Sequence, residues 1–163
     1  MLEETKICFV CLGNIVRSPL AEHLFRYLAN EAGIGKRFEV SSAGTDSWHI
    51  GEEPDRRMRR IAASHGIEYS GRARKLKKED LTYYDWIIVM DSTNKKTLLR
   101  LVENQDQIKK IHLLREFDPL GTANASVPDP YYGGIDEFEE VFQIIKRSCQ
   151  GLLGVLENNY HGS

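Results

Sequence analysis

The chain has 163 residues, a formal net charge of −2 and 41% hydrophobic residues. This length predicts one domain spanning residues 1–163, with enough apolar content for a sizeable core. A slightly acidic chain has no general positive field for nucleic acid or an anionic membrane, so we expect neither as a partner. No apolar run approaches the ~18 residues of a membrane span, and the polar start at residues 1–6 is unlike a signal peptide, which predicts a cytoplasmic protein.

The first predicted elements are a strand and a helix. Residues 6–11 (KICFVC) are nearly all apolar, as expected of a strand buried on both faces. The helix that follows is predicted to take Ser18 as its N-cap, Pro19 as its first residue and Gly33 as its end. Its apolar face is predicted to comprise Leu20, Leu24, Tyr27 and Leu28.

The alternation of strands and helices continues along the chain. Strands are predicted at 37–42, 84–90 and 109–114, and helices at 54–65 and 93–103. The last helix is predicted to begin at Asp136, with Glu139 completing a capping box. Its apolar face comprises Phe138, Val141, Phe142, Ile145, Cys149, Leu152 and Leu156.

This order of elements predicts an α/β fold: a central four-stranded parallel sheet with helices on both faces. Ligands of such sheets bind beyond the carboxyl ends of the strands. The longest irregular stretch, residues 115–134, is rich in Pro, Gly and Asn, and a loop of this length is usually functional.

The segment between the first strand and the first helix reads VCLGNIVRSP, residues 10–19. Backbone N–H groups converge at the N-terminus of a helix and bind anions there. Gly13 and Asn14 tolerate the positive φ of a tight loop, and the planar guanidinium of Arg17 matches two phosphate oxygens. We therefore predict a phosphate loop, defined as Leu12, Gly13, Asn14, Ile15, Val16, Arg17 and Ser18.

Cys11 lies directly before this phosphate loop. Helix N-termini and nearby cations favour the thiolate form of a cysteine, and a thiolate beneath a bound phosphate is a nucleophile aimed at phosphorus. The alternative interpretation makes Cys11 a small buried hydrophobe and Arg17 a surface residue. The preceding strand, the Ser-Pro helix start and the Gly-Asn pair favour the catalytic interpretation.

Attack on an aryl phosphate expels a phenolate, so a general acid is needed as well. Asp129, between two prolines, is the candidate; Asp118 is a rival in the same loop, and Asp129 could also be a simple turn residue. The aromatic residues Tyr131 and Tyr132 favour Asp129, because a flat substrate ring needs aromatic walls. Trp48 is a third candidate wall.

Four segments in this order resemble the low-molecular-weight protein tyrosine phosphatase family. They are VCLGNIVRSP (10–19) as the phosphate loop, SAGTDSWHIGEEPD (42–55) as the specificity loop, VMDSTN (89–94), and DPYYGG (129–134) with the acid. The resemblance covers nearly the whole chain. It implies a single phosphatase domain that hydrolyses phosphotyrosine in protein substrates through a cysteinyl-phosphate, releases inorganic phosphate and uses no metal or other cofactor.

The same resemblance implies roles for individual residues. Cys11 would be the nucleophile, Arg17 the ligand of phosphate and transition state, and Asp129 the general acid and then base. Ser18 would donate its hydroxyl to the thiolate. Asn14 and Ser42 would brace the phosphate loop, and the substrate ring would meet a rim of Trp48, Tyr131 and Tyr132.

Two positions depart from the family pattern. Many members carry a second cysteine before the arginine, which protects an oxidised nucleophile by forming a disulfide; here that residue is Val16. Many also carry a histidine bonded to the loop serine, where this chain has Gly71. We therefore expect peroxide to take Cys11 past the sulfenic acid more readily than in relatives with paired thiols.

Other functions find less support in the sequence. An arsenate reductase needs further cysteines, and only Cys8 and Cys149 remain. A catalytically silent phosphotyrosine reader would need neither Cys11 nor Asp129. Nucleotide-binding motifs are absent, and the five histidines lack the paired spacing of metal ligands.

Overall fold

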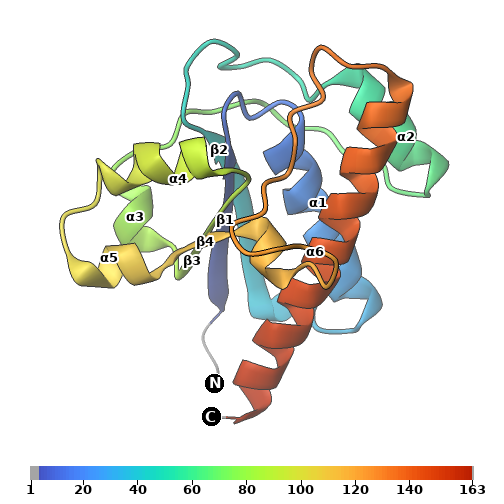
Figure 1. The fold of residues 1–163 in the computed structure, drawn as a ribbon. Coiled ribbons are helices and arrows are strands. Elements are labelled where there is room, and N and C mark those ends of the chain that lie inside the picture. The colour runs from blue at the N-terminus through green and yellow to red at the C-terminus, as the bar shows by residue number, and fades with distance from the viewer. Residues whose placement is uncertain (1–3, 163) are drawn as a thin grey trace.

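The centre of the protein is a four-stranded parallel sheet with the order β2-β1-β3-β4 (Figure 1). The computed structural model describes residues 4–162, with side chains described as far as Asn158; residues 1–3 and 163 of the predicted domain lie outside this range. The strands are β1 (Thr5–Cys11), β2 (Phe38–Gly44), β3 (Trp86–Val89) and β4 (Ile111–Leu113). The predicted fold class is confirmed.

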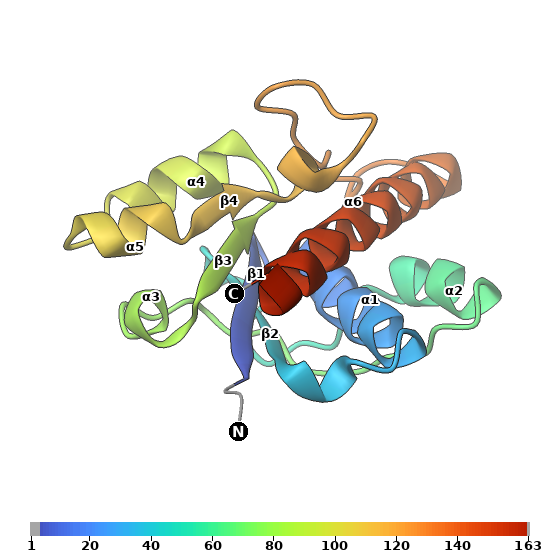
Figure 2. The same ribbon diagram turned by 90° about the horizontal axis from the view of Figure 1, so that it is seen from below.

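Helices cover both faces of the sheet (Figure 2). One face carries α1 (Arg17–Glu31), α2 (Arg56–Ser64) and α6 (Ile135–Gly162); the other carries α3 (Asp80–Tyr83), α4 (Ser92–Leu99) and α5 (Gln105–Lys109). Two short 3-10 helices, η1 (Gly35–Arg37) and η2 (Leu114–Phe117), complete the elements. Alternation along β1 sends Phe9 and Cys11 into the core beneath α1 and α6, and Cys8 and Val10 into the core beneath α4.

The N-terminus of α1 differs from its prediction. The helix begins at Arg17 with Val16 as N-cap, and no side chain caps it. Ser18 lies inside the first turn because its hydroxyl is engaged with the sulfur of Cys11, 3.0 Å away. The apolar face is also narrower than predicted, because Tyr27 remains 39% exposed while Leu20 and Leu24 are fully buried.

The start of α6 also differs from its prediction. The helix begins at Ile135, and the carboxylate of Glu137 accepts the backbone N–H of Gly134 at 2.6 Å. The capping carboxylate is therefore Glu137, while Glu139 pairs with His65, the residue after α2, at 2.9 Å. The predicted apolar face of α6 is confirmed, since all seven of its residues are buried.

Two short helices, α3 and α5, were not predicted. Both are only four or five residues long, which is too short to carry an apolar repeat that could indicate a helix. A side-chain cap begins α5, where Asn104 accepts the backbone N–H of Gln107 at 2.9 Å.

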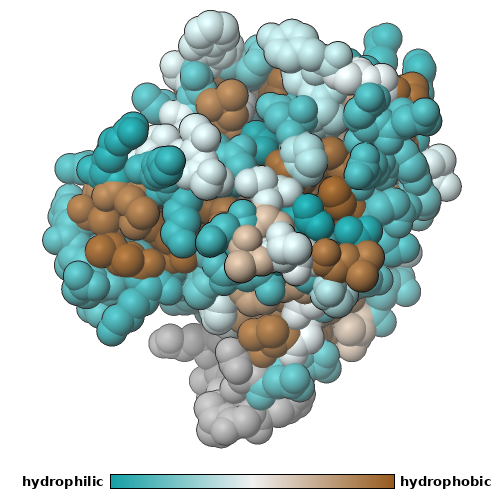
Figure 3. All heavy atoms as spheres, viewed as in Figure 1, coloured by the Kyte–Doolittle hydropathy of each residue, from teal (hydrophilic) through white to brown (hydrophobic). Residues whose placement is uncertain are grey.

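The face of the molecule in Figure 3 is mainly hydrophilic, with hydrophobic areas separated by polar side chains. One such area lies over the region of α4 and α5, whose exposed apolar residues include Leu99 and Ile108. Within residues 4–162, no helix combines the length and apolar character that a bilayer crossing requires.

Candidate active site

The phosphate loop connects the carboxyl end of β1 with the first turn of α1, at the edge of the sheet where ligands of such folds bind. Of the two residues considered for a positive φ in this loop, Asn14 adopts one, at 57°, and Gly13 does not. The start of the loop is fixed to the segment after β2: the N–H of Thr45 donates to Cys11 O, and that of Asp46 donates to Leu12 O, both at 2.9 Å. The loop is thereby wrapped around the sulfur of Cys11.

The sulfur of Cys11 lies at a convergence of hydrogen-bond donors. The backbone N–H groups of Asn14 and Ser18 point at Sγ from 3.3 and 3.4 Å, and the Ser18 hydroxyl lies 3.0 Å away. These donors belong to the first turn of α1 and to the loop before it, where the positive end of the helix dipole lies. Such an environment favours negative charge on the sulfur.

The guanidinium of Arg17 is fixed from behind. Its Nη1 donates to Asp91 Oδ2 at 2.7 Å and to the carbonyl oxygen of Val127 at 2.9 Å, and its side chain is only 3% exposed. Nη2 faces the pocket, where Asp129 Oδ2 lies 3.6 Å away. The planar group is therefore held in one orientation, with its Nη2 edge turned toward the pocket, where it can bind an anion.

The two rival carboxylates have different surroundings. Asp129 lies in the acid loop, defined as residues 127–134, lines the pocket and keeps 41% of its side chain exposed. Asp118 is fully buried away from the pocket, between Arg115 and Arg147. Burial alone would raise the pKa of Asp118, but its hydrogen bonds from Arg147, from Leu120 N and from Arg115 lower it on balance. Through these contacts Asp118 stabilises the segment that leads to the acid loop.

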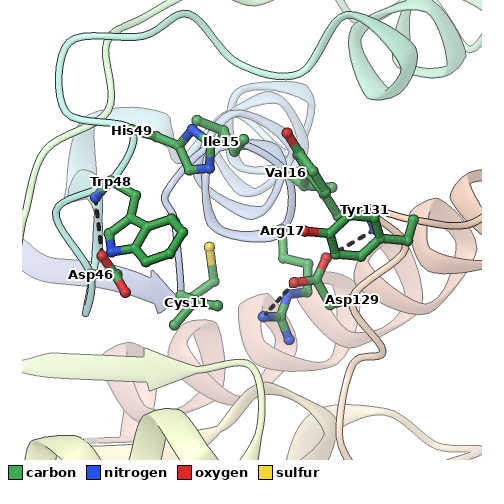
Figure 4. A pocket seen from close by; sticks show the side chains of 12 residues that line it. Cys11, Ile15, Val16, Arg17, Asp46, Trp48, His49, Asp129 and Tyr131 are labelled. Atoms are coloured by element: carbon green, nitrogen blue, oxygen red, sulfur yellow. Dashed lines mark hydrogen bonds and ion pairs between the residues drawn. The ribbon is translucent and has the colours of Figure 1, made fainter.

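A pocket of about 210 Å³ opens above Cys11. Figure 4 shows the sulfur at its floor, with Trp48 and Asp46 on one side and Tyr131 and Asp129 on the other. The three predicted rim residues all line the pocket, and two of them stand well clear of the surface, with Trp48 83% and Tyr132 97% exposed. Arg57 lies over the Tyr131 ring at 5.4 Å from its centroid.

The braces behind the phosphate loop are Asn14 and Ser42. Asn14 Nδ2 donates to the hydroxyl oxygens of Ser18 at 2.8 Å and Ser42 at 3.0 Å. Gly71 has no side chain to add, and the Ser42 hydroxyl instead donates to Glu22 of α1 at 2.6 Å.

Sequence reasoning missed several residues at this site. Asp91 was not singled out although it lies two residues after the end of β3, and position near the carboxyl end of a central strand was the available signal. His49 and Asp46 also line the pocket, and His49 Nδ1 lies 2.7 Å from Glu52 Oε2. Nothing in their spacing distinguished them from ordinary loop residues.

The remaining thiols lie away from the pocket. Cys8 is fully buried on the opposite face of the sheet, where burial raises the pKa of its thiol to about 12 despite the nearby Arg74. Cys149 is fully buried in α6, and burial raises the pKa of its thiol as well. Among the residues described, no cluster of three or more His, Cys, Asp or Glu side chains is arranged to hold a metal ion.

A nucleophilic sulfur, a fixed guanidinium and an exposed carboxylate around one pocket are the parts of a site for phosphate-ester chemistry. Residues 6–161 match the family described as low molecular weight phosphotyrosine protein phosphatase. The chain belongs to this family.

Individual relatives match over almost their whole length. A low molecular weight protein-tyrosine-phosphatase of Streptomyces coelicolor is 38% identical over 96% of both chains, and a human low molecular weight phosphotyrosine protein phosphatase is 40% identical over 90% of this chain and 92% of its own. Among solved structures, a protein tyrosine phosphatase from Entamoeba histolytica superposes with a TM-score of 0.91 at 34% identity, over 96% of this chain and 99% of its own. YfkJ from Bacillus subtilis gives 0.88 at 37% identity, over 96% and 97%.

Proposed function

We propose that this protein hydrolyses phosphotyrosine in protein substrates through a covalent phosphate ester on Cys11. The observation that carries the proposal is the position of the Cys11 sulfur, which accepts up to three hydrogen bonds at the floor of a pocket walled by Arg17 and Asp129. Membership of the family supports the reaction class.

In the first step, the phosphate oxygens bind the N–H groups of the phosphate loop and the pocket-facing edge of the Arg17 guanidinium. The sulfur attacks phosphorus while the bond to the phenolic oxygen breaks. A phenol has a pKa of about 10, so its oxygen leaves readily only with a proton, which Asp129 supplies. The negative charge that spreads over the phosphate oxygens is stabilised by Arg17, already fixed by Asp91 and Val127.

In the second step, Asp129 is a carboxylate and accepts a proton from a water that attacks the phosphorus. The P–S bond breaks, inorganic phosphate leaves and the thiolate of Cys11 is restored. The same group thus serves first as acid and then as base.

The depth of the pocket and its aromatic walls support a ring-bearing substrate over phosphoserine. Trp48 and Tyr131 stand on opposite sides of the opening, at the right places to flank a flat ring (Figure 4). We also propose a cytoplasmic location, because a reaction that needs a free thiol fits a reducing compartment, and all three cysteines are free. A net charge of −2 gives no reason to propose nucleic acid as a partner.

The test is hydrolysis of p-nitrophenyl phosphate in EDTA by the wild type and by Cys11→Ser and Asp129→Asn. We expect Cys11→Ser to be nearly inert and Asp129→Asn to lose roughly 10²- to 10⁴-fold in rate. A phosphotyrosine peptide and the matching phosphoserine peptide then report ring selectivity. Activity in Cys11→Ser would refute the mechanism, and so would a requirement for added metal.

A further inference from the structure

The amide of Asn14 can satisfy its neighbours in only one orientation. The backbone N–H of Arg74 donates to Asn14 Oδ1 at 2.9 Å, so Nδ2 must face the hydroxyls of Ser18 and Ser42. An amide nitrogen carries two hydrogens, and each is used here by one hydroxyl oxygen. Both serine oxygens are therefore acceptors toward Asn14.

A serine hydroxyl has a single hydrogen, and each serine must direct it elsewhere. For Ser18 the nearest acceptor is the Cys11 sulfur at 3.0 Å, ahead of the carbonyl oxygen of Ala43 at 3.4 Å. For Ser42 it is Glu22 Oε1 at 2.6 Å. An ionised carboxylate only accepts, so it fixes the direction of the Ser42 hydroxyl.

Glu22 is itself held in place. Its Oε2 accepts from Arg26 Nη2 at 2.8 Å, one helical turn further along α1, and the same nitrogen donates to the carbonyl oxygen of Val40 at 2.8 Å. His23 Nε2 lies 3.7 Å from the carboxylate. These contacts leave Oε1 to Ser42, and the Glu22 side chain is only 17% exposed.

We propose that Glu22 is a positioning residue of this enzyme, which acts through Ser42 and Asn14 to keep the Ser18 proton directed at the Cys11 sulfur. The Glu22 carboxylate holds the Ser42 hydroxyl behind the phosphate loop, where Gly71 offers no side chain. Gly71 lines a small cavity of about 30 Å³ together with Glu22 and Ser42, and its backbone, at φ 150°, favours glycine. Two separate segments, α1 and β2, are thereby joined behind the phosphate loop.

The inference rests on the proposed function for its kinetic readout, and a second readout is independent of it. Iodoacetate alkylation of Cys11 is measured against pH, with Cys11→Ser to show that buried Cys8 and Cys149 do not react. Glu22→Ala, Ser42→Ala and the double variant form a cycle. Glu22→Gln keeps the volume of the side chain, and Glu31→Gln, an exposed glutamate of the same helix, is the matched control.

We expect Glu22→Ala to lower kcat/KM about tenfold and Glu22→Gln about threefold, as for loss or weakening of one hydrogen bond to a charged group. The midpoint of Cys11 alkylation should move to higher pH in both, while Glu31→Gln matches the wild type. In the cycle, adding Glu22→Ala to Ser42→Ala should cost nothing further, because the path through Ser42 is already broken.

Losses that multiply in the double variant would overturn the inference, since Glu22 would then act independently of Ser42. An unchanged alkylation profile in both Glu22 variants would overturn it too. If the wild type fails to hydrolyse p-nitrophenyl phosphate, the proposed function fails, whereas the alkylation cycle still decides the role of Glu22.

Discussion

Replacing Gly44 with alanine should disturb the phosphate loop directly. Gly44 is the last residue of β2 and pairs with Cys11 across the sheet. A Cβ at this position would lie 2.8 Å from Leu12 O and 3.1 Å from Asn14 N. The backbone φ of Gly44 is not positive, so the effect of the substitution is a steric one on the loop.

The size of the effect follows from that contact. Carbon atoms rest comfortably at about 3.5 Å from their neighbours, so the loop must retreat by roughly 0.7 Å. Leu12 O also accepts the N–H of Asp46 at 2.9 Å, and the same movement strains that bond. Overpacking of this kind costs about 1–3 kcal/mol in stability. Because a displacement of about 1 Å at a reacting centre can cost 10²-fold, we expect roughly a tenfold loss in kcat.

The assay compares p-nitrophenyl phosphate turnover, inhibition by inorganic phosphate and thermal unfolding in Gly44→Ala and the wild type. Gly154→Ala in α6 is the control, because a Cβ there meets nothing within 4 Å and a helical alanine gains about 1 kcal/mol over glycine. We expect Gly154→Ala to keep full activity with an unchanged or higher Tm. Wild-type turnover and phosphate affinity in Gly44→Ala would refute the steric argument.

Three further results follow from the structure. Asp118→Asn should lower the free energy of unfolding by about 2–4 kcal/mol, because Arg115 and Arg147 lose their charged partner. Since the pKa of Asp118 is lowered in the folded protein, the difference in unfolding free energy between the variant and the wild type should narrow as pH falls below about 4. A difference that stays unchanged in acid would contradict this. Tyr69→Phe should raise Tm by about 2–4 °C in a thermal melt, since the buried Tyr69 hydroxyl has no hydrogen-bond partner among the residues that the structure describes; a lower Tm would count against this. Peroxide inactivation should be only partly reversed by dithiothreitol, because the residue before Arg17 is Val16, which has no thiol, and Cys8 packs on the far face of the sheet; complete recovery of activity would show the expectation wrong.

The sheet and the long helices could be predicted because their signals are local. The nearly continuous apolar run at 6–11, with its β-branched and aromatic residues, favoured a buried strand, and the seven apolar positions of α6 repeat at helical spacing. Helix ends were less predictable, because a cap is decided by competing partners. Ser18 has the chemistry of an N-cap, yet its hydroxyl faces the Cys11 sulfur, a partner that only the folded loop supplies.

In the candidate site too, residues in local motifs could be predicted, whereas residues whose contacts form only in the folded chain could not. Cys11, Arg17 and Asp129 stand in motifs whose spacing carries chemical meaning. Asp91 and Glu22 act on this site across 74 and 20 residues of sequence, to Arg17 and Ser42 respectively. No local pattern encodes contacts of that range, which depend on the order in which strands lie in the sheet.

The floor and the walls of the pocket come from different kinds of structure. Sulfur, guanidinium and amides are anchored in the packed interior by β1 and α1, whereas Trp48 and Tyr132 project from loops and make little contact with it. Substitutions in those loops can therefore alter which phosphorylated surface is accepted while the reacting groups stay in register. In related proteins, the loops that recognise the substrate can therefore change faster than the residues that carry out the reaction. Replacing these loops with loops from other proteins is a practical route to new selectivity.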